Sequence, residues 1–184
     1  NLEFRDLRID NVGTAFRATA DLSNLHIEGV DANNVRRFFE DYSSAPSGTA
    51  TITGLTIRDV DVRGFSRAAI RLQYDTNNVV IDNVTADMAG QTGDDLPEGV
   101  HLDGTVHNVT LSQVAMENVQ STAGAYFNGD GFASERGVYD VRFIDTVARG
   151  NSDGGYDLKS SDTVLLRALS EENGRNYRFW GEAT

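Results

Sequence analysis

Apolar and polar residues alternate in short runs that recur along the whole chain. A typical stretch is Leu55-Thr-Ile57 followed by Val60-Asp-Val62, in which every second residue is apolar. Period two is typical of β-strands, because an α-helix needs apolar residues at a spacing of 3.6. A polar pair such as Arg58-Asp59 breaks the alternation and predicts a bend between two short strands. Such stretches begin at residues 2, 25, 55, 79, 109, 141 and 164, so the chain is a sevenfold repeat whose unit varies in length.

A third short strand follows in each repeat. These strands are Ala15–Arg17, Arg37–Phe39, Ile70–Leu72, Val100–Leu102, Phe132–Ser134, Tyr156–Leu158 and Tyr177–Phe179. Three short strands per repeat predict a parallel β-helix, in which each coil stacks on the last at about 4.8 Å. The right hand follows from the chirality of strand crossovers. We therefore expect an all-β, right-handed, single-stranded parallel β-helix of about seven coils.

The length of 184 residues predicts one domain, residues 1–184. The ends of a β-helix need polar caps or covering elements. This chain starts directly on a repeat strand and stops just after another, so we expect a segment of a longer protein. Three insertions rich in Gly, Ser and Asp, residues 41–51, 87–98 and 120–129, predict loops that can wall a groove.

The composition excludes several function classes. Asp and Glu number 28 against 16 Lys and Arg, and the net charge of −12 opposes binding to nucleic acid or to anionic lipid. No apolar run approaches the ~18 residues of a membrane span, and the first residues do not form a signal peptide. Cysteine is absent, which excludes disulfides and thiolate chemistry. Its absence fits a secreted bacterial protein as well as a cytosolic one, so the compartment must come from the function.

Outward positions of the third strand carry the candidate chemistry. If the apolar residue that starts each of these strands points inward, then the next residue points to solvent and stacks on its equivalents. This first outward column is Arg71, His101, Ala133, Asp157 and Arg178. Two residues further along each strand lies a second outward column, Gln73, Asp103, Glu135, Lys159 and Trp180. We expect titratable groups of both signs, with a tryptophan, to line one face.

An acidic cluster precedes the same strands. Its members are Glu98, Asn128, Asp130, Asp153 and Asp157, on neighbouring repeats. Carboxylates held together need raised pKa values or a cation, and oxygen ligands suit Ca²⁺. The alternative is that Asp-Gly and Asn-Gly steps only make the turns of each repeat. Recurrence on neighbouring repeats favours a calcium site formed by Glu98 and the three aspartates.

The segments Asn128-Gly-Asp-Gly-Phe-Ala133, Asn151-Ser-Asp-Gly-Gly-Tyr-Asp-Leu158 and Asn173-Gly-Arg-Asn-Tyr-Arg178 carry a family resemblance. They resemble the calcium-dependent pectate lyases of polysaccharide lyase family nine, whose pattern reads ADGFA, NSDDGWDL and NGNGFK. The resemblance covers roughly residues 128–180, and similar steps occur in alginate epimerases. It implies that the aspartates at 130, 153 and 157 are calcium ligands, and it places Arg178 where the family has its catalytic lysine. Gly154 replaces a ligand aspartate, and arginine replaces the lysine base.

The expected chemistry starts with Ca²⁺ bridging the acidic protein and the carboxylate of a uronic-acid polysaccharide. This acidifies the neighbouring proton, which a base removes. Loss of the C4 substituent then gives β-elimination, whereas reprotonation from the other face gives C5 epimerisation. Arg178 has an ordinary pKa above ~12, so it can be a carboxylate clamp instead of the base. Lys159 is the other candidate base, unless it only forms an ion pair with Glu135.

The remaining candidates contact substrate. We expect Arg71, His101 and Trp180 to bind it, with the indole stacked on a sugar ring or else packed on a further repeat. His101 with Asp103 forms either an acid–base pair or two solvent-facing residues.

The adjacent Arg36 and Arg37 predict surface pairs with Glu40 and Asp41. The leading hypothesis is a secreted, calcium-assisted polysaccharide lyase that acts on an acidic polysaccharide. The alternatives are a uronan C5-epimerase, a non-catalytic carbohydrate-binding β-helix and a structural stalk.

Overall fold

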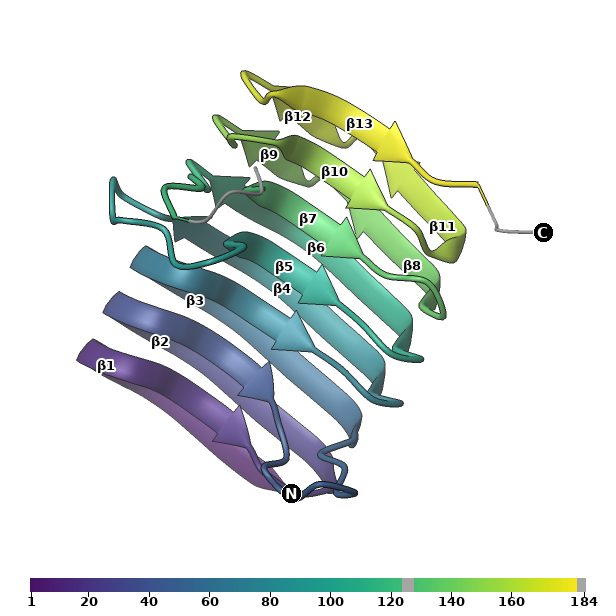
Figure 1. Ribbon diagram of the computed structural model, residues 1–184. Coiled ribbons are helices and arrows are strands. Elements are labelled where there is room, and N and C mark those ends of the chain that lie inside the picture. The colour runs from purple at the N-terminus through teal and green to yellow at the C-terminus, as the bar shows by residue number, and fades with distance from the viewer. Residues whose placement is uncertain (124–127, 182–184) are drawn as a thin grey trace.

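The computed structural model describes residues 1–123 and 128–181, and within them the chain consists of β-strands joined by turns and loops, with no helix (Figure 1). The insertion expected at 120–129 lies partly outside these residues. The thirteen strands are β1 (Leu2–Ala18), β2 (Leu22–Asp41), β3 (Ile52–Leu72), β4 (Asn77–Asp87), β5 (Glu98–Leu102), β6 (His107–Glu117), β7 (Asp130–Ser134), β8 (Tyr139–Ile144), β9 (Val147–Arg149), β10 (Gly154–Leu158), β11 (Ser161–Leu166), β12 (Leu169–Glu171) and β13 (Arg175–Phe179).

All strand pairings are parallel, and they join the strands into one curled, solenoid-like sheet. The longest path through it runs β11-β8-β6-β4-β3-β5-β7-β10-β13, and β1 joins it through β2. Each strand lies on its equivalent one repeat earlier, so the chain rises from β1 at the bottom of Figure 1 to β13 at the top. This arrangement is compatible with the parallel β-helix predicted from the repeat.

Polar residues with left-handed backbone make the bends within each repeat. Asp59 has φ 52° and Asn83 has φ 50°, at the polar steps that the sequence predicts as bends. Asn and Asp tolerate this region better than other residues with a side chain. The amide of Asn83 donates to Oδ1 of Asp59 at 2.6 Å, one repeat below. Stacked bends therefore hold neighbouring repeats in register.

The predicted register is confirmed for the first six repeats. Leu2, Leu25, Leu55, Val79, Val109 and Val141 pair in sequence and form one column. All but Leu2 are buried. The inward column of the third strand is also confirmed, because Ile70, Val100, Phe132, Tyr156 and Tyr177 pair in the same way.

The predicted start of the seventh repeat at Val164 is wrong by one residue. Val141 pairs with Thr163, and Phe143 pairs with Leu165. Val164 and Leu166 therefore point outward, with 48% and 46% of their surface exposed. The apolar run Val164-Leu-Leu166 fits period two in either phase, and only the ladder with β8 decides between them.

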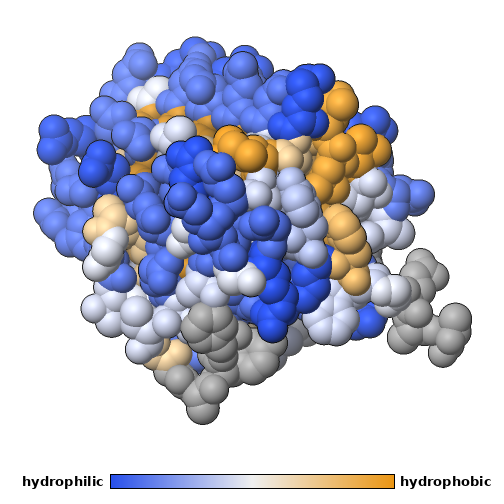
Figure 2. All heavy atoms as spheres, turned by 90° about the horizontal axis from the view of Figure 1, so that it is seen from above, coloured by the Kyte–Doolittle hydropathy of each residue, from blue (hydrophilic) through white to orange (hydrophobic). Residues whose placement is uncertain are grey.

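The last repeat carries several exposed apolar side chains. They are Val164, Leu166, Leu169, Tyr177 and Phe179. Figure 2, a view from above, shows a band of apolar surface between hydrophilic side chains.

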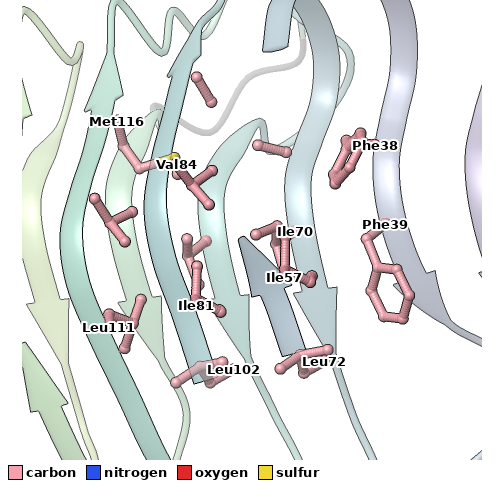
Figure 3. Packing of buried hydrophobic residues seen from close by; sticks show 14 of the residues in the cluster. Phe38, Phe39, Ile57, Ile70, Leu72, Ile81, Val84, Leu102, Leu111 and Met116 are labelled. Atoms are coloured by element: carbon pink, nitrogen blue, oxygen red, sulfur yellow. The ribbon is translucent and has the colours of Figure 1, made fainter. Parts of the chain in front are cut away.

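The core is a ladder of aliphatic and aromatic side chains inside the curl (Figure 3). In the upper repeats it becomes aromatic, since the rings of Phe132 and Tyr156 stack at 4.9 Å and those of Tyr156 and Tyr177 at 5.3 Å. The hydroxyl of Tyr156 is satisfied by Thr146 at 2.8 Å. Because aromatic pairs add to the free energy of plain burial, this stack fixes the inner end of the strands whose outer faces carry the candidate site.

Among the described residues, no helix is long and apolar enough to cross a membrane.

Candidate functional site

The residues of the two outward columns stack in the predicted register, but Ala133 and Asp157 are buried and do not face solvent. Arg71 pairs with His101, His101 with Ala133, Ala133 with Asp157, and Asp157 with Arg178. The second outward column continues the backbone ladder. The N–H groups of four of its residues each donate to a backbone carbonyl of the preceding repeat at 2.9–3.1 Å; these residues are Asp103, Glu135, Lys159 and Trp180. We call the outer faces of β2, β3, β5, β7, β10 and β13, with the residues that directly follow them, the outward stripe.

Three of the predicted acidic residues converge at the upper end of the outward stripe. Asp130 starts β7, Asp153 precedes β10 and Asp157 lies within β10, and all three are buried. We call them the carboxylate cluster. Asp130 accepts a hydrogen bond from the N–H of Gly154 at 2.6 Å. A Cβ at Gly154 would lie 2.5 Å from Oδ1 of Asp130. The glycine that stands here in place of the aspartate of the resembled pattern therefore lets the Asp130 carboxylate lie against the backbone of β10.

Arg178 lies at the centre of the carboxylate cluster. Its Nη2 is 2.6 Å from Oδ2 of Asp157, 3.1 Å from Oδ2 of Asp153 and 3.8 Å from Oδ1 of Asp130. Its Nε also donates to Oδ1 of Asp157 at 2.9 Å, which completes a two-pronged pair. The Arg175 guanidinium pairs with Asp153 as well. Two guanidinium groups thus neutralise most of the charge of three carboxylates.

The pKa values follow from these contacts. Burial, and then the charge of Asp157, raise the pKa of Asp130 to about 7. The hydrogen bond to Asp157 raises the pKa of Arg178 above its already high ordinary value, so this side chain stays protonated. Its role as a base stays a prediction, and its contacts favour the ion-pairing alternative. Arginine is the cation suited to a buried pair with carboxylates.

In this arrangement the carboxylate cluster is paired with arginine, and the calcium site stays a prediction. Within residues 1–123 and 128–181, no group of three or more His, Asp or Glu side chains is placed to hold a metal ion. Arg178 takes the place among the carboxylates that a cation would need. Glu98, the fourth predicted ligand, pairs in register with Asp130, but its carboxylate binds a histidine instead.

Lys159 and Trp180 extend the outward stripe beside the carboxylate cluster. Nζ of Lys159 lies 2.6 Å from Oε1 of Glu135, so the ion pair weighed against a base role is present. The indole N–H of Trp180 donates to Asp157. Lys159 and Arg178 lie over the indole ring, 5.7 and 5.5 Å from its centroid. Trp180 is 46% exposed, so a ring with cations beside it faces solvent.

His101 pairs with Glu98, and not with Asp103, which was the partner in one of the two alternatives from the sequence. Nδ1 of His101 is 2.8 Å from Oε2 of Glu98. Burial alone would lower the pKa of His101, but the hydrogen bond to Glu98 and its charge outweigh burial and raise it. Nε2 of His101 and Nε of Arg71 are both buried without a hydrogen-bond partner, on adjacent repeats. Unpartnered buried polar atoms are uncommon and mark a centre with a functional role or a missing ligand.

A second cationic centre lies at the lower end of the outward stripe and is not predicted by the sequence. It is an open pocket of about 300 Å³, which we call the arginine pocket, lined by Arg17, Arg36, Arg37, Glu40, Tyr42 and Arg71. The predicted pair of Arg37 with Glu40 is present at 3.3 Å, but both side chains are buried, so the prediction that it lies at the surface is wrong. Arg36 pairs with Asp94 at 2.6 Å, and Asp41 is buried against Thr76. Arg17 pairs with Glu40 and Glu40 with Arg71, so extending the first outward column to the two lowest repeats would have found this centre from the sequence.

No family model matches the chain, and no curated protein or solved structure matches it either. The likeness to pectate lyases therefore rests on the three short segments between residues 128 and 180.

Proposed function

We propose that the protein binds an acidic polysaccharide along the outward stripe of a right-handed, single-stranded parallel β-helix of seven coils. The parallel ladders and the stacked inward column support this architecture. In such a fold the columns run across the coils, so a linear glycan that follows them contacts one repeat after another.

The supporting observation is that cations and exposed aromatic rings meet at both ends of the outward stripe. At the lower end Tyr42 is 42% exposed, and the Arg17 guanidinium lies 5.6 Å from its ring centroid. At the upper end Trp180 lies beneath Arg178 and Lys159. Aromatic rings are platforms for sugar rings, and arginine recognises planar carboxylates. In a chain of net charge −12 this gathering favours an acidic sugar polymer as ligand.

The ion pairs of Arg178 and Lys159 support a role in binding more than a role as catalytic bases. Both candidate bases form close ion pairs, with Asp157 and Glu135 respectively. The protonated Arg178 guanidinium cannot accept a proton from substrate, and the amine of Lys159 is engaged by Glu135. We therefore propose glycan binding as the primary function.

A specific observation favours a second candidate, β-elimination or C5 epimerisation of a uronate. The pair of His101 and Glu98 lies beside Arg71, which carries an unpartnered Nε. Arg71 would pair with the uronate carboxylate and acidify the proton on C5, which neutral His101 would take. In elimination the C5–H electron pair forms the C4–C5 double bond, the C4–O bond breaks, and the leaving oxygen takes a proton. Because Nε2 of His101 is buried, the surrounding structure must move before substrate can reach it.

A polysaccharide of this kind lies outside cells, so we propose a secreted protein. The first experiment measures binding of polygalacturonate, alginate and a neutral glucan by isothermal titration calorimetry, with calcium and with chelator. Ultraviolet detection of unsaturated uronide on the same samples tests elimination. We expect both acidic polymers to bind and the glucan not to bind.

Substitution separates the outward stripe from other surfaces. Tyr42→Ala and Trp180→Ala should each weaken polymer binding about tenfold, as loss of one stacking platform does. Tyr139→Ala is the matched control, because Tyr139 is an exposed tyrosine on β8, away from the outward stripe. Equal binding by all three variants would show that glycans do not use the outward stripe.

A further inference from the structure

We infer that the arginine pocket binds the oxyanion group of an acidic sugar, a carboxylate or a sulfate. This inference rests on the proposed function for the polymer, but the pocket itself is argued from its own residues. It lies on β1, β2 and β3, outside residues 128–180, which carry the family resemblance.

The charges of the arginine pocket are unbalanced. Four of its six lining residues are arginines, and Glu40 is the single carboxylate among them. Arg17 binds Glu40 through Nε at 2.8 Å, and Arg37 approaches the other oxygen of Glu40 at 3.3 Å. One carboxylate thus serves two guanidinium groups, so the lining keeps a net positive charge that favours an anion.

Arg37 is the buried anchor of the arginine pocket. Its side chain is only 7% exposed, and its Nε lies 3.3 Å from Oε2 of Glu40 as an ion pair without making a hydrogen bond. Burial, with the charges of Arg36, Arg67 and Arg71 nearby, lowers the pKa of Arg37, although Glu40 opposes this. Burying a guanidinium with an unused donor is costly unless an acceptor arrives. An oxyanion is the acceptor that matches several guanidinium groups at once.

Arg71 also has donors to offer to an anion in the pocket. Its closest carboxylate is Asp103, at 4.0 Å, and its own Nε is buried without a partner. Tyr42 adds an exposed ring beside Arg17, on which the sugar that carries the anion can stack. The volume of about 300 Å³ is at the small end for ligand pockets, which suits one sugar unit of a longer chain.

The test measures small anions on the folded chain. Sodium sulfate, sodium galacturonate and trigalacturonate are titrated by calorimetry and by thermal shift, against sodium chloride at equal ionic strength. We expect trigalacturonate to bind and to raise the melting temperature. Arg71→Gln and Arg17→Gln should each weaken binding about tenfold or more. Arg58→Gln is the control, because Arg58 lies on the same strand but pairs with Asp82 at 3.1 Å, outside the arginine pocket.

The outcomes separate this inference from the proposed function. Sulfate binding that Arg71→Gln removes supports a general oxyanion site, and binding of galacturonate alone supports a carboxylate site. Polymer binding that Arg71→Gln and Arg17→Gln leave unchanged would overturn the pocket but keep the proposed function. Small anions that bind without any polymer binding would support the pocket and overturn the proposed function. Failure of every anion to exceed chloride would overturn the pocket.

Discussion

Nη2 of Arg178 lies 2.6 Å from Oδ2 of Asp157 on the strand below it, and Nε of the same guanidinium is 2.9 Å from Oδ1. This two-pronged pair joins β10 to β13 through side chains in addition to the backbone ladder. It also neutralises a carboxylate cluster that would otherwise repel itself.

Removal of Arg178 should therefore destabilise the protein strongly. Arg178→Ala leaves three buried carboxylates with only Arg175 to neutralise them, and loss of one partner of a buried pair costs about 3–5 kcal/mol. Urea unfolding measures this change in the free energy of unfolding. The control is Arg167→Ala, which breaks an exposed pair with Asp145 and should cost about 1 kcal/mol or less. Equal losses in the two variants would mean that Arg178 does not neutralise the cluster.

Removal of metal should leave the wild-type protein unchanged. Because Arg178 supplies the positive charge among the carboxylates, a chelator should not shift the melting temperature. In Arg178→Ala the cluster lacks this cation, so millimolar Ca²⁺ should recover part of the lost stability. Asp157→Asn in the same background should abolish the recovery. A wild-type protein that loses stability on chelation would support the predicted calcium site and contradict this expectation.

As the pH rises from about 4 to about 7, the free energy of unfolding should decrease because of two buried carboxyl groups. Burial raises the pKa of Asp41 to about 7, and burial with Asp157 does the same for Asp130. In this window the folded carboxyl keeps a proton that the unfolded chain has lost, so rising pH favours unfolding. Asp41→Asn removes one ionisation and keeps an acceptor for Thr76. Relative to wild type it should gain on the order of 2–4 kcal/mol across the window.

Urea melts from pH 4 to pH 8 measure this difference for each variant. Asp61→Asn is the control, because Asp61 is exposed on β3. A constant difference between Asp41→Asn and wild type at all pH values would contradict the assigned shift.

The pKa of His101 should depend on Glu98. Since the hydrogen bond and charge of Glu98 outweigh burial, Glu98→Gln should lower the pKa of His101 below its ordinary value. Titration of the imidazole signals by nuclear magnetic resonance measures it, with His107 as an internal reference. If uronate turnover is detected, the lower limb of its pH profile should move to lower pH in the same variant. An unchanged His101 titration would show that Glu98 does not control it.

Sequence reasoning could predict the ladder because period two and the polar bends act locally. Asp59 and Asn83 mark bends by their own conformational tolerance, and Ile70 to Tyr177 share a column by chemical type. It could not fix the phase of Val164-Leu-Leu166, where local patterning is the same in both registers. The register shift between Val35 and Arg37, which precedes the buried guanidinium, has no signal of its own either.

The candidate site was predictable as a set of neighbours but not as a set of pairs. The columns correctly bring Asp157, Arg178, Lys159 and Trp180 to one face. Long side chains, however, choose among several partners within reach. Thus His101 selects Glu98 over Asp103, and Arg178 enters the carboxylate cluster that a calcium ion was expected to occupy.

The parallel ladder also sets how the molecule should respond to force. Each described strand pairs only with its equivalents in the adjacent repeats, and side-chain contacts such as Arg36 with Asp94 add the few links that span two repeats. Pulling along the long axis should then unfold the repeats one after another, with a separate rupture event for each interface between repeats. The interface between β10 and β13, bridged by the Arg178 pair and the stacked tyrosines, should resist more than its backbone hydrogen bonds alone would allow.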